Sequence, residues 1–441
     1  MDGKKVLFNL GDEHISAEEV LGFLASIQQM QNLSGALLRK IVKALKMRQF
    51  GPGELISDGQ AGQEFYIIWK GEVEVRAQRV AVAGGSPALV LKAGDCFGAG
   101  LAGVLESHTQ VEVLALDEVT CLFLSHEHLS LVSNVSARSS MLTEGVAVVE
   151  QILNLENLAV DLFRGFTLPG APSFGNVYGG QLVAQALAAA SQSVNPPLLV
   201  HSLHCYFVVG GDITLPIVYR VKRLKDGNSF ALRHVDAMQN GQIIFNMNAS
   251  FQKPWEGLEH QTLRPDAPDP ETIPSLILHQ GRFFTEDQFF KNMKNEDRER
   301  FRVKRPLDVR SCDIVYPHNE KKLDPREKVW IRSKEKLTND EALHRCVAAY
   351  ASDWTILDTC FRPHHSKNIR LKGLSLDHSM WFHKPFKADE WLLLVADSPR
   401  ASTGRGLALG HFYTQSGELV VSVAQEGLIR ELEQQKIESR L

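Results

Sequence analysis

Two stretches of this chain, residues 163–252 and 329–430, repeat one pattern, and this duplication restricts the possible folds more than any other feature. Each copy begins with a helical segment rich in small residues and continues in long strands that alternate apolar and polar side chains. Small side chains let a sheet close around a helix. The repeat therefore predicts two α+β units of the same kind, each with one helix wrapped by a curved antiparallel sheet.

The two copies can be aligned through their strand–turn–strand segments. Residues 230–234 run parallel to residues 407–411, and after a slip of one position residues 239–245 match residues 415–421. The second pair of segments contains hairpin turns, Asn-Gly in the first copy and Ser-Gly in the second, and such turns accept positive φ.

A helix is expected near the start of each copy. In the first copy, apolar residues recur at helical spacing over residues 180–194. In the second, Thr338 and Glu341 have the spacing of a capping box, and the helix that follows is expected to run to about Asp353. The first helix contains no carboxylate, whereas the second ends on one.

The part of the chain before the repeat has a different pattern. Leucines and an isoleucine recur at helical spacing over residues 33–45, and short alternating runs follow, for example over residues 64–76. Many short strands between turn residues indicate an all-β barrel or sandwich. A helix from Glu127 to about Leu155 is expected to connect this domain to the repeat.

The composition argues against several classes of function. The net charge of −4 over 441 residues gives no electrostatic footprint for nucleic acid or an anionic membrane. The longest apolar stretches, near residues 182–190 and 391–396, are too short to span a bilayer. The six cysteines form no Cys-x-x-Cys pair, so we expect reduced thiols, no metal site and no cofactor.

Between the two copies, residues 254–326 hold the densest charge and proline of the chain. That composition is typical of a connection that runs over the surface. We therefore expect a linker there, with one short helix at about residues 285–302.

The first domain carries a recognisable set of residues. They are Phe50-Gly51-Pro52-Gly53-Glu54, Asp58-Gly59 and residues 65–75. Over about residues 23–147 this domain resembles cyclic-nucleotide-binding domains, in which a Glu holds the ribose and an Arg pairs with the phosphate. Here Ala99 and Gly100 stand where the family has Glu, and no Arg occurs from Lys92 to Ala137. Because a buried phosphate without a partner is costly, we expect no binding of cAMP or cGMP.

Seven blocks of the repeated part occur in the order found in one enzyme family. They are residues 178–181, 200–207, 226–230, 249–252, 350–353, 377–383 and 425–427. On these blocks, residues 155–432 resemble acyl-CoA thioesterase II, the double hotdog hydrolases. The fusion to a cyclic-nucleotide-binding-like domain is similar to the plant peroxisomal acyl-CoA hydrolases.

The resemblance implies a multidomain fold, a β-rich, jelly-roll-like cyclic-nucleotide-binding domain followed by an α+β double hotdog. The expected division is an N-terminal segment (1–22), the cyclic-nucleotide-binding-like domain (23–147), a first hotdog (155–253), the linker (254–326), a second hotdog (327–432) and a tail (433–441).

The resemblance also implies an active site. In this family a water is held by an Asp at the end of the second copy's helix, a Ser or Thr on the next strand and a Gln on the last strand. Those residues are Asp353, Ser375 and Gln425 here. The repeat supports them independently, because the alignment matches Gln425 with Ala249 and Ser375 with Val200. The polar residues thus occur only in the second copy, where no shared packing rule requires them.

A thioester is an activated acyl group, so its hydrolysis to a free fatty acid and CoA needs an oriented water, a base and stabilisation of negative charge. We expect Asp353 to be the general base and Ser375 and Gln425 to position the water, since hydroxyl and carboxamide groups both donate and accept. Asp353 as a nucleophile, through an anhydride, is the alternative. Backbone N–H groups of Gly179 and Gly180, at the start of the first helix, are candidates for binding the oxyanion.

Two other functions are compatible with these folds. One is a non-catalytic regulatory or assembly protein. The other is a hotdog dehydratase acting on acyl thioesters, which would need a His together with a carboxylate in its site.

The sequence also suggests a location and partners. Ser439-Arg440-Leu441 is a variant of the Ser-Lys-Leu peroxisomal address, so we expect binding to the import receptor and residence in the peroxisomal matrix. Hotdog sheets usually pair through exposed edges, so a homo-oligomer is expected, with a tetramer as the family-like state.

Overall fold

A computed structural model describes most of the chain between residues 6 and 432. The described residues are 6–10, 13–27, 30, 33, 35–57, 64–77, 89–98, 111–133, 145–168, 176–279, 282–285, 305–313, 323–364 and 370–432. Several sequence predictions lie outside them, namely those on Asp58-Gly59, Ala99 and Gly100, on most of the helix at 285–302 and on the tail at 433–441.

The N-terminal domain is a sandwich of two four-stranded antiparallel sheets. Its elements are β1 (Val6–Leu10), β2 (Glu13–Ser16), α1 (Ala17–Ser26), α2 (Gly35–Ala44), β3 (Lys46–Phe50), β4 (Leu55–Ser57), β5 (Glu64–Lys70), β6 (Val73–Ala77), β7 (Leu89–Leu91), β8 (Cys96–Gly98), β9 (Val111–Ala115), β10 (Val119–Ser125), η2 (His126–His128) and α3 (Ser130–Ser133). One sheet has the order β3-β10-β5-β8 and the other β4-β9-β6-β7. Tyr66, Ile68 and Val73 pack between them, which confirms the all-β prediction.

The first copy of the repeat comprises one long helix and six strands. Its elements, after the short helix α4 (Val148–Leu153), are β11 (Glu156–Ala159), β12 (Leu162–Gly165), α5 (Gly179–Gln192), β13 (Leu199–Phe207), β14 (Ile217–Asp226), β15 (Phe230–Gln239) and β16 (Gln242–Gln252).

The second copy has the same plan. The elements that follow β16 are η3 (Pro270–Thr272), β17 (Leu276–His279), β18 (Arg282–Thr285), β19 (Leu307–Ser311), β20 (Arg326–Ser333), α8 (Glu341–Ser352), η4 (Ile356–Cys360), η5 (Arg362–His364), β21 (Arg370–Ser375), β22 (Asp377–Phe382), β23 (Leu392–Ser402), β24 (Arg405–Thr414) and β25 (Leu419–Leu432).

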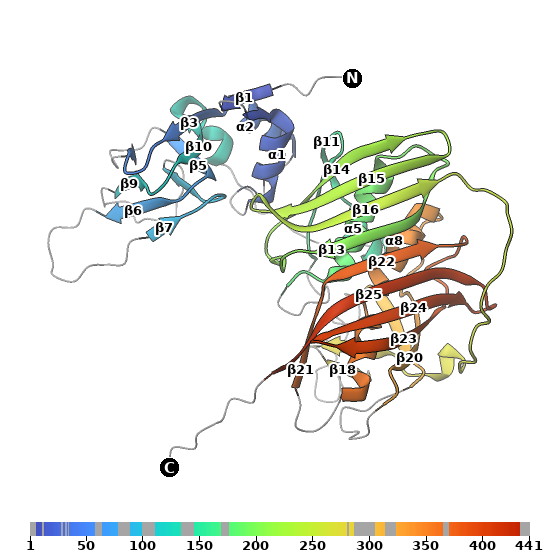
Figure 1. The fold of residues 1–441 in the computed structure, drawn as a ribbon. Helices are drawn as coiled ribbons and strands as arrows, with labels where there is room; N and C mark the ends of the chain where they lie inside the picture. The colour runs from blue at the N-terminus through green and yellow to red at the C-terminus, as the bar shows by residue number, and fades with distance from the viewer. Residues whose placement is uncertain are drawn as a thin grey trace, which may run out of the picture.

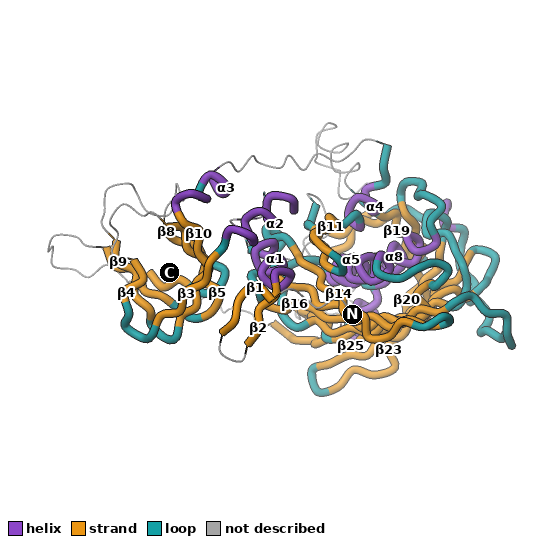
Figure 2. Tube along the Cα trace, turned by 90° about the horizontal axis from the view of Figure 1, so that it is seen from above, coloured by secondary structure: helices purple, strands orange, loops and turns teal. Residues whose placement is uncertain are grey.

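The two copies share one continuous antiparallel sheet. Its order is β11-β12-β14-β15-β16-β13-β22-β25-β24-β23-β20-β19, with β21 paired to β25. The copies join at β13 and β22, where Leu203 lies opposite Met380. Figure 1 shows α5 and α8 side by side on one face of this sheet, and Figure 2 shows the same layering from above.

Small residues allow the helices to sit deep in the fold. In α5 the alanines at positions 184, 186, 188, 189 and 190 are all buried, as the wrapped-helix prediction requires. The second helix begins differently from the prediction. Asp340 is its N-cap and accepts a hydrogen bond from Ala342 N at 3.0 Å, while Thr338 Oγ1 bonds to Glu150. The capping-box prediction was wrong because an acceptor closer to the helix start was present.

Strand register shows how the copies correspond. A β-bulge in β16 lies five residues before Ala249, and one in β25 lies five residues before Gln425, so these two residues hold equivalent positions. Arg233 pairs with Ala249, and Ala408 pairs with Gln425. The alignment that matched Arg233 with Gly410 is therefore wrong by two positions in this strand. A shift of two leaves every side chain on its predicted face.

The connection between the domains is not the single helix predicted from 127 to 155. In that range the structure describes η2, α3 and α4, and Gly145 just before α4 has a φ of 80°. That backbone conformation suits glycine and ends a helix, so apolar spacing alone was misleading here.

The segment predicted as a surface linker also contributes to the second copy. β19 pairs with β20 at the edge of the large sheet, and its Leu307 and Val309 are buried. The prediction was wrong for these residues because a five-residue strand is easily hidden in a charged, proline-rich sequence.

The N-terminal domain packs directly on the first copy. The expected boundary between residues 22 and 23 falls inside α1, whose Val20 and Leu24 share one apolar cluster with Leu162 and Val218. Ser26 also caps the β15–β16 turn, since Gly241 N donates to Ser26 Oγ at 3.0 Å. Among the described residues, no helix combines the length and hydrophobicity that a bilayer crossing requires.

Candidate active site

The carboxylate of Asp353 lies where the two central helices meet. α8 ends at Ser352, and Asp353 is its C-cap. Asp353 Oδ2 accepts a hydrogen bond of 2.9 Å from the backbone N–H of Gly180, in the first turn of α5. A carboxylate of the second copy is therefore bound at the helix N-terminus of the first, where the helix dipole favours negative charge.

Gln425 connects this carboxylate to Ser375. The Gln425 side chain is fully buried in β25, and its Nε2 donates to Asp353 Oδ1 at 2.9 Å and to Ser375 Oγ at 2.6 Å. Ser375 ends β21 and is partly exposed. The structure thus brings the three residues selected from the sequence into one hydrogen-bonded group.

Two glycines permit the close approach of α5. A Cβ on Gly180 would lie 2.4 Å from Tyr350 O, and a Cβ on Gly179 would lie 2.6 Å from Asp353 Oδ2. The N–H of Gly180 was expected to bind an oxyanion, but here the carboxylate already occupies it. Gly180 therefore orients the proposed base, and Gly179 is the remaining candidate from that pair.

Burial adjusts the acidity of the site. It raises the pKa of Asp353 from 3.8 to about 6, while the hydrogen bonds from Gln425 and Gly180 oppose the rise. Asp353 is still partly exposed. Such a carboxylate is ionised at neutral pH and is a stronger base than an ordinary Asp. Asp358 in η4 is a second carboxyl with a raised pKa, about 7, owing to burial and to the charge of Asp353.

The hydrogen-bonded group has two further members, His378 and Ser352, that the sequence analysis did not assign to the site. His378 in β22 is fully buried, with Nδ1 2.7 Å from Gln425 Oε1 and Nε2 2.8 Å from Ser352 Oγ. Burial lowers the pKa of His378 to about 4, so the ring is neutral. Register matches His378 with Leu203 of the first copy. The contrast between copies that selected Ser375 would have found it.

The repeated part of the chain matches known protein families. Residues 296–428 match the acyl-CoA thioesterase family, and residues 168–252 match the acyl-CoA thioesterase N-terminal domain. Acyl-coenzyme A thioesterase 8 of Rattus norvegicus is 40% identical over 291 residues, which is 64% of this chain and 89% of that relative. The chain belongs to the acyl-CoA thioesterase family.

Bacterial acyl-CoA thioesterases are also similar to this chain. Acyl-CoA thioesterase 2 of Haemophilus influenzae is 36% identical over 284 residues, covering 63% of this chain and 96% of the relative. The crystal structure of an acyl-CoA thioesterase II from Mycobacterium marinum is 37% identical with a TM-score of 0.52, covering 65% of this chain and 99% of that one. The predicted hydrolase class and the α+β repeat are thereby confirmed.

The fused domain of this thioesterase has its own match. Residues 47–132 match the cyclic nucleotide-binding domain family, which confirms the second resemblance. A cAMP-dependent protein kinase regulatory subunit from Mycosarcoma maydis is 38% identical over 78 residues, or 17% of this chain and 14% of that protein. That the domain binds no cyclic nucleotide stays a prediction.

In the first copy of this thioesterase, an arginine occupies the position that corresponds to the surroundings of Asp353. Ser193 is the C-cap of α5, as Asp353 is of α8. Arg233 is 1% exposed and donates to Ser193 Oγ at 2.8 Å and to Ser193 O at 3.1 Å. With Val200 and Ala249 at the other two positions, the first copy holds no equivalent set of carboxylate, hydroxyl and carboxamide within the described residues.

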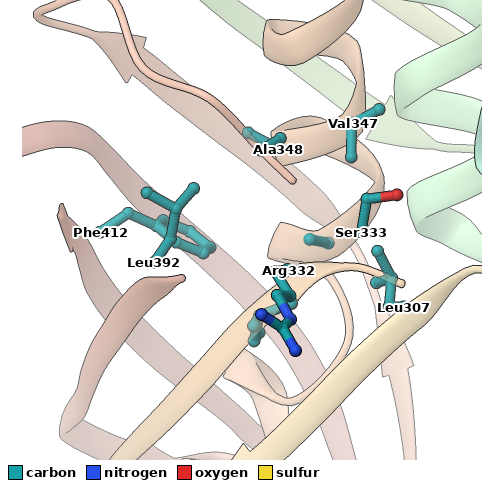
Figure 3. A pocket seen from close by; sticks show the side chains of 10 residues that line it. Leu307, Arg332, Ser333, Val347, Ala348, Leu392 and Phe412 are labelled. Carbon is teal, nitrogen blue, oxygen red and sulfur yellow. The ribbon is translucent and has the colours of Figure 1, made fainter. Parts of the chain in front are cut away.

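An apolar pocket of this thioesterase lies beside α8, as Figure 3 shows. Its cavity volume is only about 10 Å³, and it is lined by Leu307, Ile331, Arg332, Ser333, Val347, Ala348, Ala351, Ala388, Leu392 and Phe412. Ala351 is two residues from Asp353, so this small hollow adjoins the helix that ends at the proposed base. In the part of the chain that the structure describes, no cluster of His, Cys, Asp and Glu could hold a metal ion.

Proposed function

We propose that this thioesterase hydrolyses fatty acyl-CoA to a free fatty acid and CoA with a water activated by Asp353, Ser375 and Gln425. The observation that carries the proposal is the hydrogen-bonded chain from Asp353 Oδ1 through Gln425 Nε2 to Ser375 Oγ, next to a partly exposed carboxylate.

Asp353 acts as the general base. It accepts a proton from the water as the water oxygen bonds to the thioester carbonyl carbon. The C–S bond then breaks, CoA leaves as a thiolate, and the proton on Asp353 is available to neutralise it. A carboxyl with a pKa of about 6 can both accept and return this proton near neutral pH.

Ser375 and Gln425 have different tasks in this mechanism. Both hydrogens of the Gln425 amide are used, one by Asp353 and one by Ser375, so Gln425 fixes the distance between them. The Ser375 oxygen accepts from Gln425, which leaves its own proton for the water or for the developing oxyanion. The N–H of Gly179 is the other donor we assign to the oxyanion.

The direct test is thiol release from acyl-CoA by the purified protein and by Asp353→Asn. We expect the variant to lose about 100- to 10,000-fold in rate, the usual contribution of a general base. A residual rate near one half would mean a second centre in the first copy. Water loss from a hydroxyacyl-CoA without free thiol would instead indicate the dehydratase.

Isotopic labelling separates the two roles of Asp353. In a single turnover in water containing oxygen-18, general-base catalysis puts the label in the fatty acid alone. An anhydride on Asp353 that water opens at the Asp353 carbonyl would instead put the label into the protein and leave the fatty acid of the first turnover unlabelled.

We further propose that this enzyme resides in peroxisomes and binds the import receptor through Ser439-Arg440-Leu441. A relative from Saccharomyces cerevisiae, 27% identical over 334 residues, is named peroxisomal acyl-coenzyme A thioester hydrolase 1. A fluorescent fusion should enter peroxisomes with the tripeptide and stay outside without it. The homo-oligomer, with a tetramer as the expected state, is tested by light scattering on the purified protein.

A further inference from the structure

Gln425 has a partner on the side away from Asp353, and that partner is a neutral histidine. The carboxamide can be placed in two ways that exchange Oε1 and Nε2. Only one of them is compatible with Asp353, because an ionised carboxylate accepts hydrogen bonds and donates none. His378 Nδ1 lies 2.7 Å from the oxygen of this orientation.

We propose that His378 is a positioning residue that holds the Gln425 carboxamide with its amide nitrogen toward Asp353 and Ser375. Oε1 of Gln425 can only accept, so His378 carries its proton on Nδ1 and donates it. Rotation of the amide would place two donors against each other and an oxygen against the Asp353 carboxylate. The histidine thus excludes the inactive orientation.

Ser352 holds the other side of the ring. Ser352 Oγ lies 2.8 Å from His378 Nε2 and 2.9 Å from Ala349 O, and with the ring proton on Nδ1 the single hydroxyl proton of Ser352 is directed to Nε2. Ser352 is the last residue of α8, directly before Asp353. His378, Ser352 and Gln425 are all fully buried, so water does not compete for these bonds. The ring therefore connects the end of α8 to β25 behind the catalytic carboxylate.

The first copy has no histidine–carboxamide pair at the equivalent positions. His378 corresponds to Leu203, and Gln425 corresponds to Ala249, so both members of the pair are apolar there. A buried histidine would have no acceptor opposite an alanine. Its presence only where the carboxamide occurs indicates a role tied to that carboxamide.

The inference rests on the proposed function and is tested by a double-mutant cycle. We expect His378→Leu to lower kcat about 10- to 100-fold with KM within about two-fold, since the displaced amide no longer orders the base. In a Gln425→Leu background the same substitution should cost less than about two-fold more. An equal loss in both backgrounds, or no loss in the first, would overturn the proposal.

A matched pair of variants distinguishes loss of the hydrogen bond to Gln425 from misfolding. His378→Asn places an amide nitrogen near Nδ1 and should keep kcat within about tenfold of the parent protein. His378→Gln reaches only toward Ser352 and should fall at least tenfold below His378→Asn. Equal activities, or the reverse order, contradict the positioning role.

The pH profile supplies a readout that a purely structural role would not move. The hydrogen bond from Gln425 lowers the pKa of Asp353, so its loss in His378→Leu should shift the acid limb of kcat/KM to higher pH. His378→Asn should leave the limb in place. If Asp353→Asn stays active, the proposed function fails; if only the His378 variants behave otherwise, the positioning role alone fails.

Discussion

Gly180 and Asp353 belong to different copies of the repeat, yet the Gly180 N–H donates to Asp353 Oδ2 at 2.9 Å. The carboxylate proposed as the base is therefore oriented by the opposite copy. Neither copy alone would form the site, because one supplies the helix N-terminus and the other supplies the carboxylate, hydroxyl and carboxamide.

Replacing Gly180 with alanine should separate the two copies at this point. Its Cβ would lie 2.4 Å from Tyr350 O, so α5 must move away from the end of α8. We expect kcat/KM for acyl-CoA to fall at least about 100-fold. Gly257→Ala is the control, since no atom lies within 4 Å of its Cβ, and it should stay within about two-fold. Near-normal hydrolysis by Gly180→Ala would show that the contact is not needed.

The activity should depend on pH through Asp353. Burial raises the pKa of this carboxyl to about 6, and the ionised form is the base, so kcat/KM should be constant above about pH 7 and fall tenfold per unit below 6. Thiol release with a reagent that works in acid measures this. Asp358→Asn is the control, because it removes the neighbouring carboxyl whose pKa is about 7. A limb that disappears in this variant would belong to Asp358.

The same shift has a consequence for stability, with the opposite sign. Because the folded pKa of Asp353 exceeds the unfolded value of 3.8, this group contributes most at low pH and its contribution is lost as pH rises through about 6. The loss is at most about 3 kcal/mol, since Asp353 is partly exposed. The unfolding free energy of the parent protein relative to Asp353→Asn should therefore decrease between pH 4 and 7 in urea titrations, and a rise would contradict the burial of this carboxyl.

Ser375 offers a test of the hydroxyl alone. Ser375→Ala removes the acceptor for Gln425 and the donor toward the substrate, so we expect kcat to fall about 10- to 1,000-fold, as for an oxyanion donor. Ser375→Thr keeps the hydroxyl and should retain most of the activity in the thiol-release assay. If both variants lose the same activity, the size of the side chain matters and the hydroxyl does not.

Much of this site could be predicted from sequence because the chain contains its own control. Gln425 against Ala249, and Ser375 against Val200, are differences at equivalent positions that packing does not explain. His378 was not assigned to the site because only the strand register shows that its counterpart in the first copy is the apolar Leu203, and that register depends on β-bulges.

Other features could not be derived from the sequence for a physical reason. The hydrogen bond from Gly180 N–H to Asp353 depends on how two helices pack, and the two residues are 173 positions apart in the chain. The edge strand with Leu307 is stabilised by its neighbour β20 more than by its own propensity. Such contacts between distant segments leave no periodic pattern.

The contact between the N-terminal domain and the first copy should contribute strongly to stability. Arg164 in β12 is fully buried, donates to Leu33 O of the N-terminal domain at 2.7 Å and pairs with Glu156. Arg164→Ala would remove the hydrogen bond to Leu33 O and break an ion pair whose arginine is fully buried, so we expect a loss of about 3–5 kcal/mol in unfolding free energy. Urea titration followed by tryptophan fluorescence measures it.

The neighbouring strand supplies a matched control for this prediction. Arg223 in β14 pairs with Asp161 through two hydrogen bonds, but its side chain is 43% exposed. Because solvent screens an exposed ion pair, Arg223→Ala should cost no more than about 1 kcal/mol. Equal losses of unfolding free energy for the two variants would mean that the buried Arg164 does not stabilise the contact between the N-terminal domain and the thioesterase core. A large loss for Arg164→Ala alone, with both domains unfolding at lower urea, would show that this arginine is an important part of the contact through which the two domains stabilise each other.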